Sequence, residues 1–140
     1  MTTRDPIALG LPHREPFIFI DEVTALDPGE SASGRKSFAP ETPFFAGHFP
    51  GDPLVPGVIL TEALAQIAGL AAARPGGGGM RLAAIKAMKF VRAVRPGETI
   101  NLSARKAGAV GGLWQFSVEA RVGQEIAAEG VIVLAETPAI

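Results

Sequence analysis

The chain has 140 residues, which is enough for one compact domain and leaves too little material for a second hydrophobic core. Its 13 basic and 14 acidic residues give a formal net charge of -1, so no overall field would hold nucleic acid or an anionic membrane, and neither is expected as a partner. The absence of cysteine excludes disulfides and thiolate metal sites and fits a reducing compartment such as the cytoplasm. We therefore expect a cytoplasmic protein in which residues 1–140 form a single domain.

The first part of the chain predicts two strands followed by a long loop. Residues 1–11 contain no continuous apolar run of the kind found in secretory signals. Bulky and branched residues predict a strand over 17–23 that ends near 27–29, and residues 31–38 are expected to pair with it as a hairpin. From 40 to 57, repeated prolines and glycines exclude both a helix and a central strand and indicate a shaped loop.

A long apolar helix is predicted directly after Pro56 and Gly57. Proline suits the first turn of a helix, and the apolar run continues over 58–73 before the proline and glycines at 75–79 end it. Apolar residues on every side leave this helix no face for solvent, so other structure should wrap it. Polar residues interrupt the run, which is also shorter than the roughly 20 residues that cross a bilayer, so no membrane span is expected.

The last part of the chain alternates as half-buried antiparallel strands do. Apolar and polar residues alternate over 99–105 and again over 114–122, with turn residues at 108–112 between them, and residues 131–135 supply a last strand. One buried helix with strands before and mostly after it predicts an α+β fold in which a curved antiparallel sheet wraps a central helix. Periodicity alone does not separate this fold from other α+β sandwiches.

The most informative residue of the long loop is His48. It lies between Gly47 and the sequence Phe-Pro-Gly, where glycine permits unusual backbone angles and proline stiffens the chain. The imidazole should therefore be held in one orientation, as a catalytic base requires. A loop histidine that only hydrogen-bonds the backbone is the alternative.

Two groups of the predicted helix could assist such a base. Glu62 has Gln66 one turn later on the same face, and an apolar setting favours a protonated carboxyl that can donate a proton. The N–H of Gly57, in the first helical turn, lacks an intrahelical acceptor and could polarise a carbonyl. The alternatives are a structural glutamate satisfied by Gln66 and an ordinary tight start of a helix.

A base, an acid and a carbonyl donor together suit the elimination of water from a 3-hydroxy thioester. This reaction needs no metal or organic cofactor, and the sequence predicts none. His13, the only other histidine, has no cysteine or second histidine at ligand spacing, and no glycine-rich phosphate loop opens a helix after a strand.

Several segments carry a resemblance to a known family. They are L-P-H-R-E-P-F at 11–17, P-F-F-A-G-H-F-P-G at 43–51, P-G-V at 56–58, E-A-L-A-Q at 62–66, and K-F at 89–90 with R-P-G at 95–97. In these motifs the chain resembles the FabZ-type (3R)-hydroxyacyl-[acyl carrier protein] dehydratases, which have the hot-dog fold. The resemblance extends over most of 11–135, and the 14 residues from His48 to Glu62 (62 minus 48) match the spacing of that family's catalytic pair.

The resemblance implies a reaction and a role for each group. His48 would abstract the proton at C2, Glu62 would donate a proton to the departing C3 hydroxyl, and the Gly57 N–H would hold the thioester oxygen. The product would be trans-2-enoyl-acyl carrier protein, in the biosynthesis of fatty acids or related acyl chains. In this family the histidine and the glutamate come from different chains, so a homodimer is implied, and members often assemble further into a trimer of dimers.

Further candidate residues follow from the resemblance. The acyl chain would lie in an apolar tunnel, and the acidic carrier protein would dock on basic residues. The candidate substrate-binding residues are Phe44, Phe45, Phe49, Val58, Gln66 and Phe90, and the candidate docking residues are Lys86, Lys89, Arg92 and Arg95. Core packing is the alternative for the phenylalanines, and a solvated strand face is the alternative for the basic residues. The chain departs from the family pattern at Lys86 and Ala93 and has no tyrosine, which predicts an altered chain-length preference.

Two other functions stay open on the sequence alone: a non-catalytic hot-dog subunit that binds acyl carrier protein, and an acyl-thioester hydrolase. The presence of His48, Glu62 and Gly57 argues against the first. The Gly-His-Phe-Pro-Gly loop favours elimination over hydrolysis.

Overall fold

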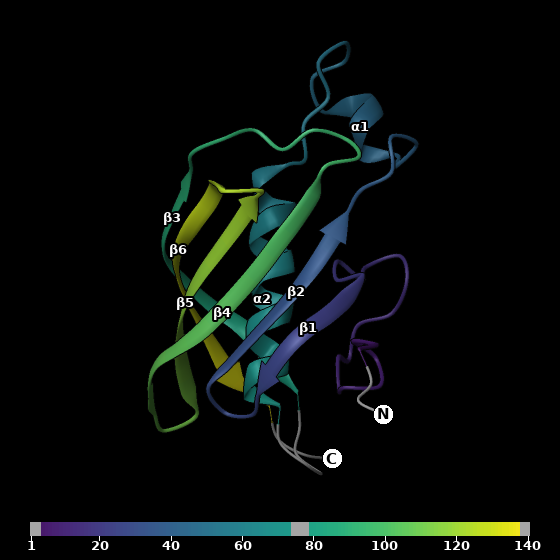
Figure 1. Cartoon of the computed structure of the whole chain (residues 1–140). Coiled ribbons are helices and arrows are strands. Elements are labelled where there is room, and N and C mark those ends of the chain that lie inside the picture. The colour runs from purple at the N-terminus through teal and green to yellow at the C-terminus, as the bar shows by residue number, and fades with distance from the viewer. Residues whose placement is uncertain (1–3, 74–78, 138–140) are drawn as a thin grey trace.

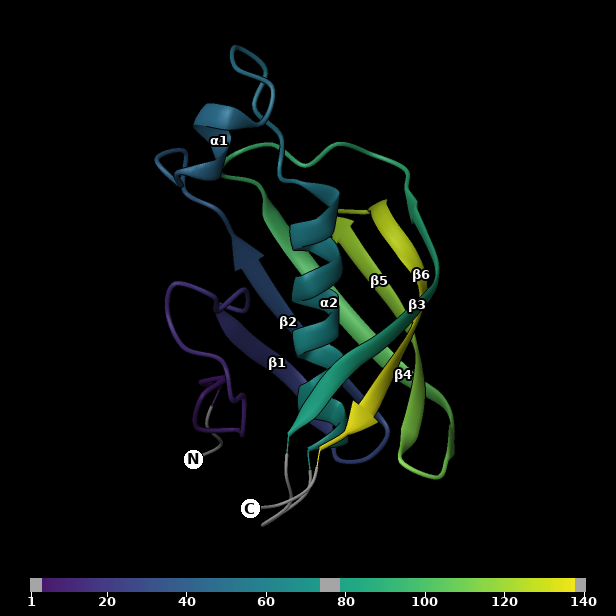
Figure 2. The same cartoon turned by 180° about the vertical axis from the view of Figure 1, so that it is seen from behind.

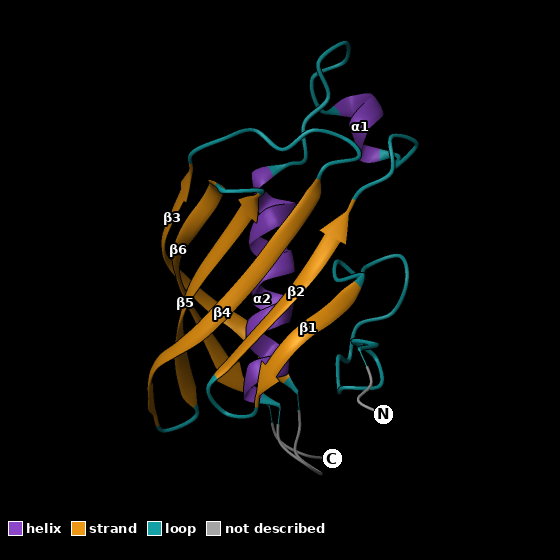
Figure 3. Cartoon of the chain, viewed as in Figure 1, coloured by secondary structure: helices purple, strands orange, loops and turns teal. Residues whose placement is uncertain are grey.

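A computed structural model describes residues 4–73 and 79–137 and shows one curved antiparallel sheet around a long helix (Figures 1 and 3). The strand order is β1-β2-β4-β5-β6-β3, so β1 and β3 form the two edges. The helices are α1 (Phe44–Gly47) and α2 (Gly57–Ala72). The strands are β1 (Glu22–Asp27), β2 (Ser31–Ser37), β3 (Met80–Phe90), β4 (Thr99–Val110), β5 (Leu113–Val122) and β6 (Glu125–Glu136).

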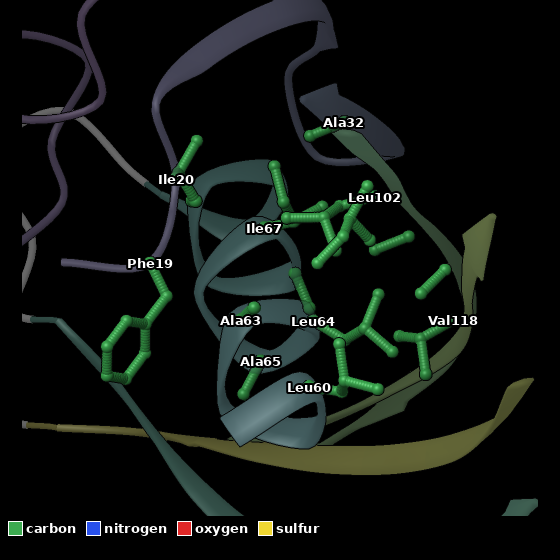
Figure 4. Packing of buried hydrophobic residues seen from close by; sticks show 14 of the residues in the cluster. Phe19, Ile20, Ala32, Leu60, Ala63, Leu64, Ala65, Ile67, Leu102 and Val118 are labelled. Carbon is green, nitrogen blue, oxygen red and sulfur yellow. The ribbon is translucent and has the colours of Figure 1, made fainter. Parts of the chain in front are cut away.

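Helix α2 is the centre of the core, as its apolar composition predicts. Pro56 precedes it with an extended backbone, and Leu60 is the first of its buried residues. Figure 4 shows Leu64 and its neighbours pointing from the helix toward Leu102 and Val118 of the sheet. Burying a leucine side chain contributes about 1.5–3 kcal/mol, so the contact between helix and sheet stabilises the fold.

The N-terminal segment, residues 4–21, lies beside β1 (Figure 2) and contacts α2 through the side chain of Gln66. Leu11, Phe19 and Ile20 are buried there. The backbone N–H of Phe19 donates to Oε1 of Gln66 at 2.9 Å, and Nε2 of Gln66 donates to the carbonyl oxygen of Phe17 at 3.0 Å. The side-chain amide of Gln66 therefore supplies the hydrogen bonds that a neighbouring strand would otherwise give to the backbone of Phe17 and Phe19.

This contact explains one error of the sequence analysis. The strand predicted over 17–23 is wrong for residues 17–21, because the first strand begins only at Glu22. Bulky residues at 17–20 resemble a strand in sequence, but their backbone bonds the side chain of Gln66. The predicted partner at 31–38 is confirmed as β2, which pairs with β1 in antiparallel register.

The remaining differences concern short or exposed elements. The loop predicted over 40–57 contains the single helical turn α1, and the last strand begins at Glu125 rather than at residue 131. Strand β3 was not predicted, because most of its side chains are exposed and small alanines interrupt any apolar alternation. Helix α2 ends at Ala72, and residues 75–78 of its predicted stop lie outside the described part of the chain.

The close approach of β3 to β6 gives a stability prediction. A methyl group at Gly130 of β6 would overlap the backbone carbonyl oxygen of Ala87 in β3, which cannot rotate away. Gly130→Ala should lower the free energy of unfolding by about 1–3 kcal/mol, as overpacking typically does. Urea unfolding measures this. Gly108→Ala in β4 is the matched control, since its new methyl group would meet no atom within 4 Å. Equal stability of the two variants would contradict the close approach.

Candidate active site

His48 is held at the end of the turn formed by α1. Its backbone N–H donates to the carbonyl oxygen of Phe44 at 3.0 Å, and its ring Nδ1 lies 3.0 Å from the carbonyl oxygen of Leu54. A carbonyl oxygen only accepts hydrogen bonds, so the proton of the neutral ring is on Nδ1. The lone pair is then on Nε2, which is the form of imidazole that accepts a proton.

The residue after His48 adopts a backbone conformation that is uncommon for its type. Phe49 has φ of 60°, in the left-handed region, and its ring packs edge-on to the His48 ring with 4.6 Å between centroids. Such a conformation costs on the order of 1–3 kcal/mol and occurs most often at functional sites. The surrounding loop, rather than the preference of Phe49 itself, therefore fixes the direction of the imidazole.

His48 and Gly57 line the same cavity, which has a volume of about 360 Å³. The loop before α2 and the connection between β3 and β4 meet at this end of the helix (Figure 1), where the backbone N–H of Val55 donates to the carbonyl oxygen of Val94. Within the described residues, the N–H of Gly57 donates to no acceptor. The ring of Phe90 lies so close to Gly57 that an added methyl group would be only 3.0 Å from it. The cavity thus combines an imidazole, a free backbone donor and an aromatic wall.

Glu62 does not line this cavity. Five residues after Gly57, it is turned by roughly 140° around the helix axis and displaced by about 7 Å along it. Its Oε2 accepts a hydrogen bond from Nε2 of Gln66 at 3.1 Å and lies 3.3 Å from Nε2 of His13. The side chain of Glu62 is 22% exposed, so its surroundings are more polar than the apolar pocket expected from the sequence.

A second cavity, of about 530 Å³, lies beside Glu62 between the N-terminal segment and α2. His13 and Gln66, the two partners of Glu62, line it at one end, and Met80 lines it as well. It extends along the helix past Gly69, where an added methyl group would meet no atom within 4 Å. Its lining is mostly apolar, including Leu9, Leu11 and Leu70.

The candidate substrate-binding residues are distributed over different surroundings. Phe45 is buried in the core and Phe44 packs against it, whereas Phe49, Val58 and Phe90 are more than half exposed. Of these five, only Phe90 lines the cavity of His48. Gln66 is 1% exposed, and both ends of its amide are used in holding the backbone and Glu62.

Three of the candidate docking residues bond another side chain of the chain, and the fourth, Lys89, lies opposite an acidic residue in the sheet. Lys86 donates to Gln115, and Lys89 faces Glu129 across the pairing of β3 and β6. Arg92 forms a bidentate pair with Glu98, and Arg95 pairs with Asp52 of the loop that follows His48. Arg92 also lines the cavity of His48. The Arg92–Glu98 pair lies within the connection between β3 and β4, and the Arg95–Asp52 pair joins that connection to the loop before α2.

The Arg92–Glu98 pair gives a prediction of pH dependence. The hydrogen bond from the Arg92 guanidinium lowers the pKa of the Glu98 carboxyl below its ordinary value. A lowered pKa in the folded state adds stability that is present above the ordinary glutamate value of about 4.3 and is lost as the pH falls through the folded value. The advantage in unfolding free energy of the wild type over Glu98→Gln should therefore shrink below about pH 4.

Urea unfolding between pH 7 and pH 3 measures this difference. Glu41→Gln is the control, because Glu41 is exposed and has no partner among the described residues, so its difference from the wild type should stay nearly constant. If the wild-type and Glu98→Gln curves ran parallel down to pH 3, the assignment of this pair to acid stability would be wrong.

His13 is the residue that the sequence analysis missed. It was considered only as a metal ligand, and among the described residues no group of three or more His, Cys, Asp or Glu side chains could hold a metal ion. Its actual partner, Glu62, lies 49 residues away, and no sequence spacing signals that contact. The L-P-H-R motif was the only available indication.

No helix in the described ranges is long and apolar enough to cross a membrane.

Comparisons with known proteins agree with this architecture. In fold, the chain is similar to the dehydratase heterocomplex ApeI:P from Xenorhabdus doucetiae, with a TM-score of 0.77 and 16% identity over 95% of this chain and 91% of that one. It is also similar to the uncharacterized protein PH1136 from Pyrococcus horikoshii, with a TM-score of 0.71 and 17% identity over 88% and 87%. The sheet around one main helix is the hot-dog fold that the resemblance implied.

Sequence relatives cover nearly the whole chain. The 3-hydroxyacyl-[acyl-carrier-protein] dehydratase FabZ of Ruminiclostridium cellulolyticum is 42% identical over 99% of this chain and 100% of its own length. The protein of the same name from Acetivibrio thermocellus is 42% identical over 94% and 92%. The model of the FabA-like domain matches residues 11–130. By this match and these relatives, the chain belongs to the FabA-like family, as its resemblance to FabZ-type dehydratases predicted.

Proposed function

We propose that the chain is a dehydratase that removes water from (3R)-hydroxyacyl thioesters on acyl carrier protein, in the cytoplasmic biosynthesis of fatty acids or related acyl chains. Relatives at 37–42% identity carry the name of this activity. The observation that carries the proposal is the Nδ1 contact of His48 with the Leu54 carbonyl, which leaves Nε2 as a base in a residue that lines the same cavity as Gly57. Together they supply a base and a carbonyl donor on one cavity.

Each group has one step in the elimination. Nε2 of His48 takes the proton from C2, and the Gly57 N–H stabilises the negative charge that develops on the thioester oxygen. The electron pair of the C2–H bond forms the C2–C3 double bond. The C3–O bond breaks as Glu62 gives its proton to the hydroxyl, which leaves as water. The proton on His48 then returns Glu62 to its acid form by way of solvent.

The acid comes from a second copy of the chain in this proposal. Glu62 does not line the cavity that His48 and Gly57 share, so one chain alone offers only part of the machinery. Strand β3 supplies a surface for the second copy, because only one of its edges is paired and it exposes Leu82, Ile85 and Phe90. Unpaired strand edges and exposed apolar side chains are the usual features of such an interface. A trimer of dimers would be a further step of assembly.

The substrate then contacts both copies of the chain. The acyl chain lies in the apolar cavity beside Glu62, and the thioester lies at Gly57 of the other copy. The carrier protein docks around the mouth of the His48 cavity, where Arg92 is a lining residue and Arg95 lies nearby in the same connection. Lys86 and Lys89 on β3 extend this basic surface, which complements an acidic carrier.

Product analysis tests the proposal. The purified protein is mixed with acyl carrier protein bearing a 3-hydroxyacyl chain, and the products are followed by mass. Loss of one water with the thioester intact supports dehydration. Release of the free acid would indicate a hydrolase, and an unchanged carrier would indicate a binding subunit, so either result would overturn the assignment.

A further inference from the structure

His13 is the other histidine of the chain besides His48, and the proposed reaction assigns it no role. It lies in the N-terminal segment, where its ring stacks on Phe17 with 6.3 Å between centroids and an interplanar angle of 22°. Its Nε2 is 3.3 Å from Oε2 of Glu62, and its Nδ1 is buried without a hydrogen-bond partner among the described residues. The stacking fixes the plane of the ring, and the contact directs one nitrogen at Glu62.

The tautomer of His13 follows from these surroundings. Nδ1 is buried and, within the described residues, unpaired in either tautomer, so the contact of Nε2 decides: without a proton there, its lone pair would face the lone pairs of the Glu62 oxygen at 3.3 Å. A proton on Nε2 instead faces the Glu62 oxygen across this contact. His13 therefore carries its proton on Nε2, whereas His48 carries its proton on Nδ1 opposite the Leu54 carbonyl. The two histidines of the chain are opposite tautomers.

The two oxygens of Glu62 are consequently distinct. Oε2 receives one hydrogen bond from Gln66 and faces the Nε2 donor of His13. Oε1 has no partner in the part of the chain that the structure describes. When the carboxyl is protonated, the oxygen that accepts from Gln66 and faces the His13 donor serves as the carbonyl oxygen, so the acidic proton resides on Oε1.

We propose that His13 is a positioning residue that, with Gln66, fixes Oε2 of Glu62 as an acceptor and so presents the acidic proton on Oε1 to the substrate. The inference rests on the proposed dehydratase function. Gln66 alone cannot hold the carboxyl plane, because one hydrogen bond leaves the group free to rotate about its terminal bond, and a second donor from another element restricts that rotation. The N-terminal segment thereby contributes to the acid without contacting the reacting atoms.

Two substitutions separate positioning from packing. His13→Phe keeps the stacking on Phe17 and removes the donor, and we expect it to lower kcat for dehydration by about tenfold, the effect of losing one polar contact of about 1 kcal/mol. Its KM should stay within about twofold, since the phenylalanine ring keeps the volume with which His13 lines the cavity of the acyl chain. His13→Gln places an amide donor near the position of Nε2 and should recover most of kcat. Equal losses in the two variants would overturn the proposal and leave a structural role.

A double-mutant cycle shows whether the effect passes through Glu62. If His13 acts only on that carboxyl, then His13→Phe should change the residual rate of Glu62→Gln by less than about twofold. A further tenfold loss in the double variant would contradict the inference, because it would mean that His13 acts on the reaction by another route.

The tautomers can be observed without substrate. Long-range nitrogen–proton NMR of the ¹⁵N-labelled wild type should show two imidazole rings, one protonated on Nε2 and one on Nδ1, assigned by loss of one set in His13→Gln. A His13 ring protonated on Nδ1 would overturn the inference whatever the enzyme's activity. Failure of the proposed function is recognised separately, by absence of dehydration in the wild type.

Discussion

His48→Ala is expected to lower the rate of dehydration by about 10²- to 10⁴-fold, the usual effect of removing a general base. The loss should be in kcat, because Nε2 acts on the C2 proton in the transition state and contributes little to binding of the acyl chain. Mass detection of the enoyl product on acyl carrier protein measures the residual rate. Free imidazole should restore part of the activity, since the deleted ring leaves room for it.

His48→Asn is the matched variant that separates catalysis from loop structure. The asparagine amide nitrogen can occupy the position of Nδ1 and donate to the Leu54 carbonyl, so the loop contact at 3.0 Å is preserved. The variant has no counterpart of Nε2. It should be as inactive as His48→Ala while its thermal midpoint stays close to that of the wild type. Near-normal turnover in His48→Asn would mean that the histidine only fastens the loop.

The sequence predicts the parts of this site that depend on local chain geometry. Pro56 and Gly57 begin a helix because proline suits a first turn, and the same position leaves the Gly57 N–H without an intrahelical acceptor. His48 is constrained by the glycines and proline next to it in the chain. These features need only a few consecutive residues, which is why a single sequence sufficed to identify them.

The parts that were missed depend on contacts between distant segments. The backbone at 17–19 bonds Gln66, and His13 faces Glu62, although 47 to 49 residues separate them. Hydrophobic periodicity carries no information on such pairs, because it reports only which face of an element is buried. Strand β3 was missed for a related reason: as an edge strand it shows no alternation of buried and exposed residues. The partner of Arg95 likewise emerges only when separate loops meet, since Asp52 is 43 residues away in the sequence.

Glu62→Gln should also be nearly inactive, with a loss of about 10²- to 10⁴-fold, because an amide cannot give up a proton to the departing hydroxyl. The amide can still accept from Gln66 through its carbonyl oxygen, so the fold should be retained. Glu41→Gln makes the same chemical change on an exposed loop and should keep full activity. Normal turnover of Glu62→Gln would remove this residue from the mechanism.

Mixing the two inactive variants tests where the acid comes from. If His48 of one chain works with Glu62 of another, a dimer of one His48→Ala chain and one Glu62→Gln chain has one site with both native groups and one site with neither. Random exchange makes half of the dimers mixed, so the mixture should recover about one quarter of the wild-type rate. If both groups acted within one chain, every site in the mixture would lack one of them and no activity would return. The experiment requires chain exchange, which mass spectrometry of differently tagged chains verifies beforehand. A mixture that exchanges fully and stays inactive would place both groups on one chain, which the roughly 140° between Gly57 and Glu62 around α2 argues against.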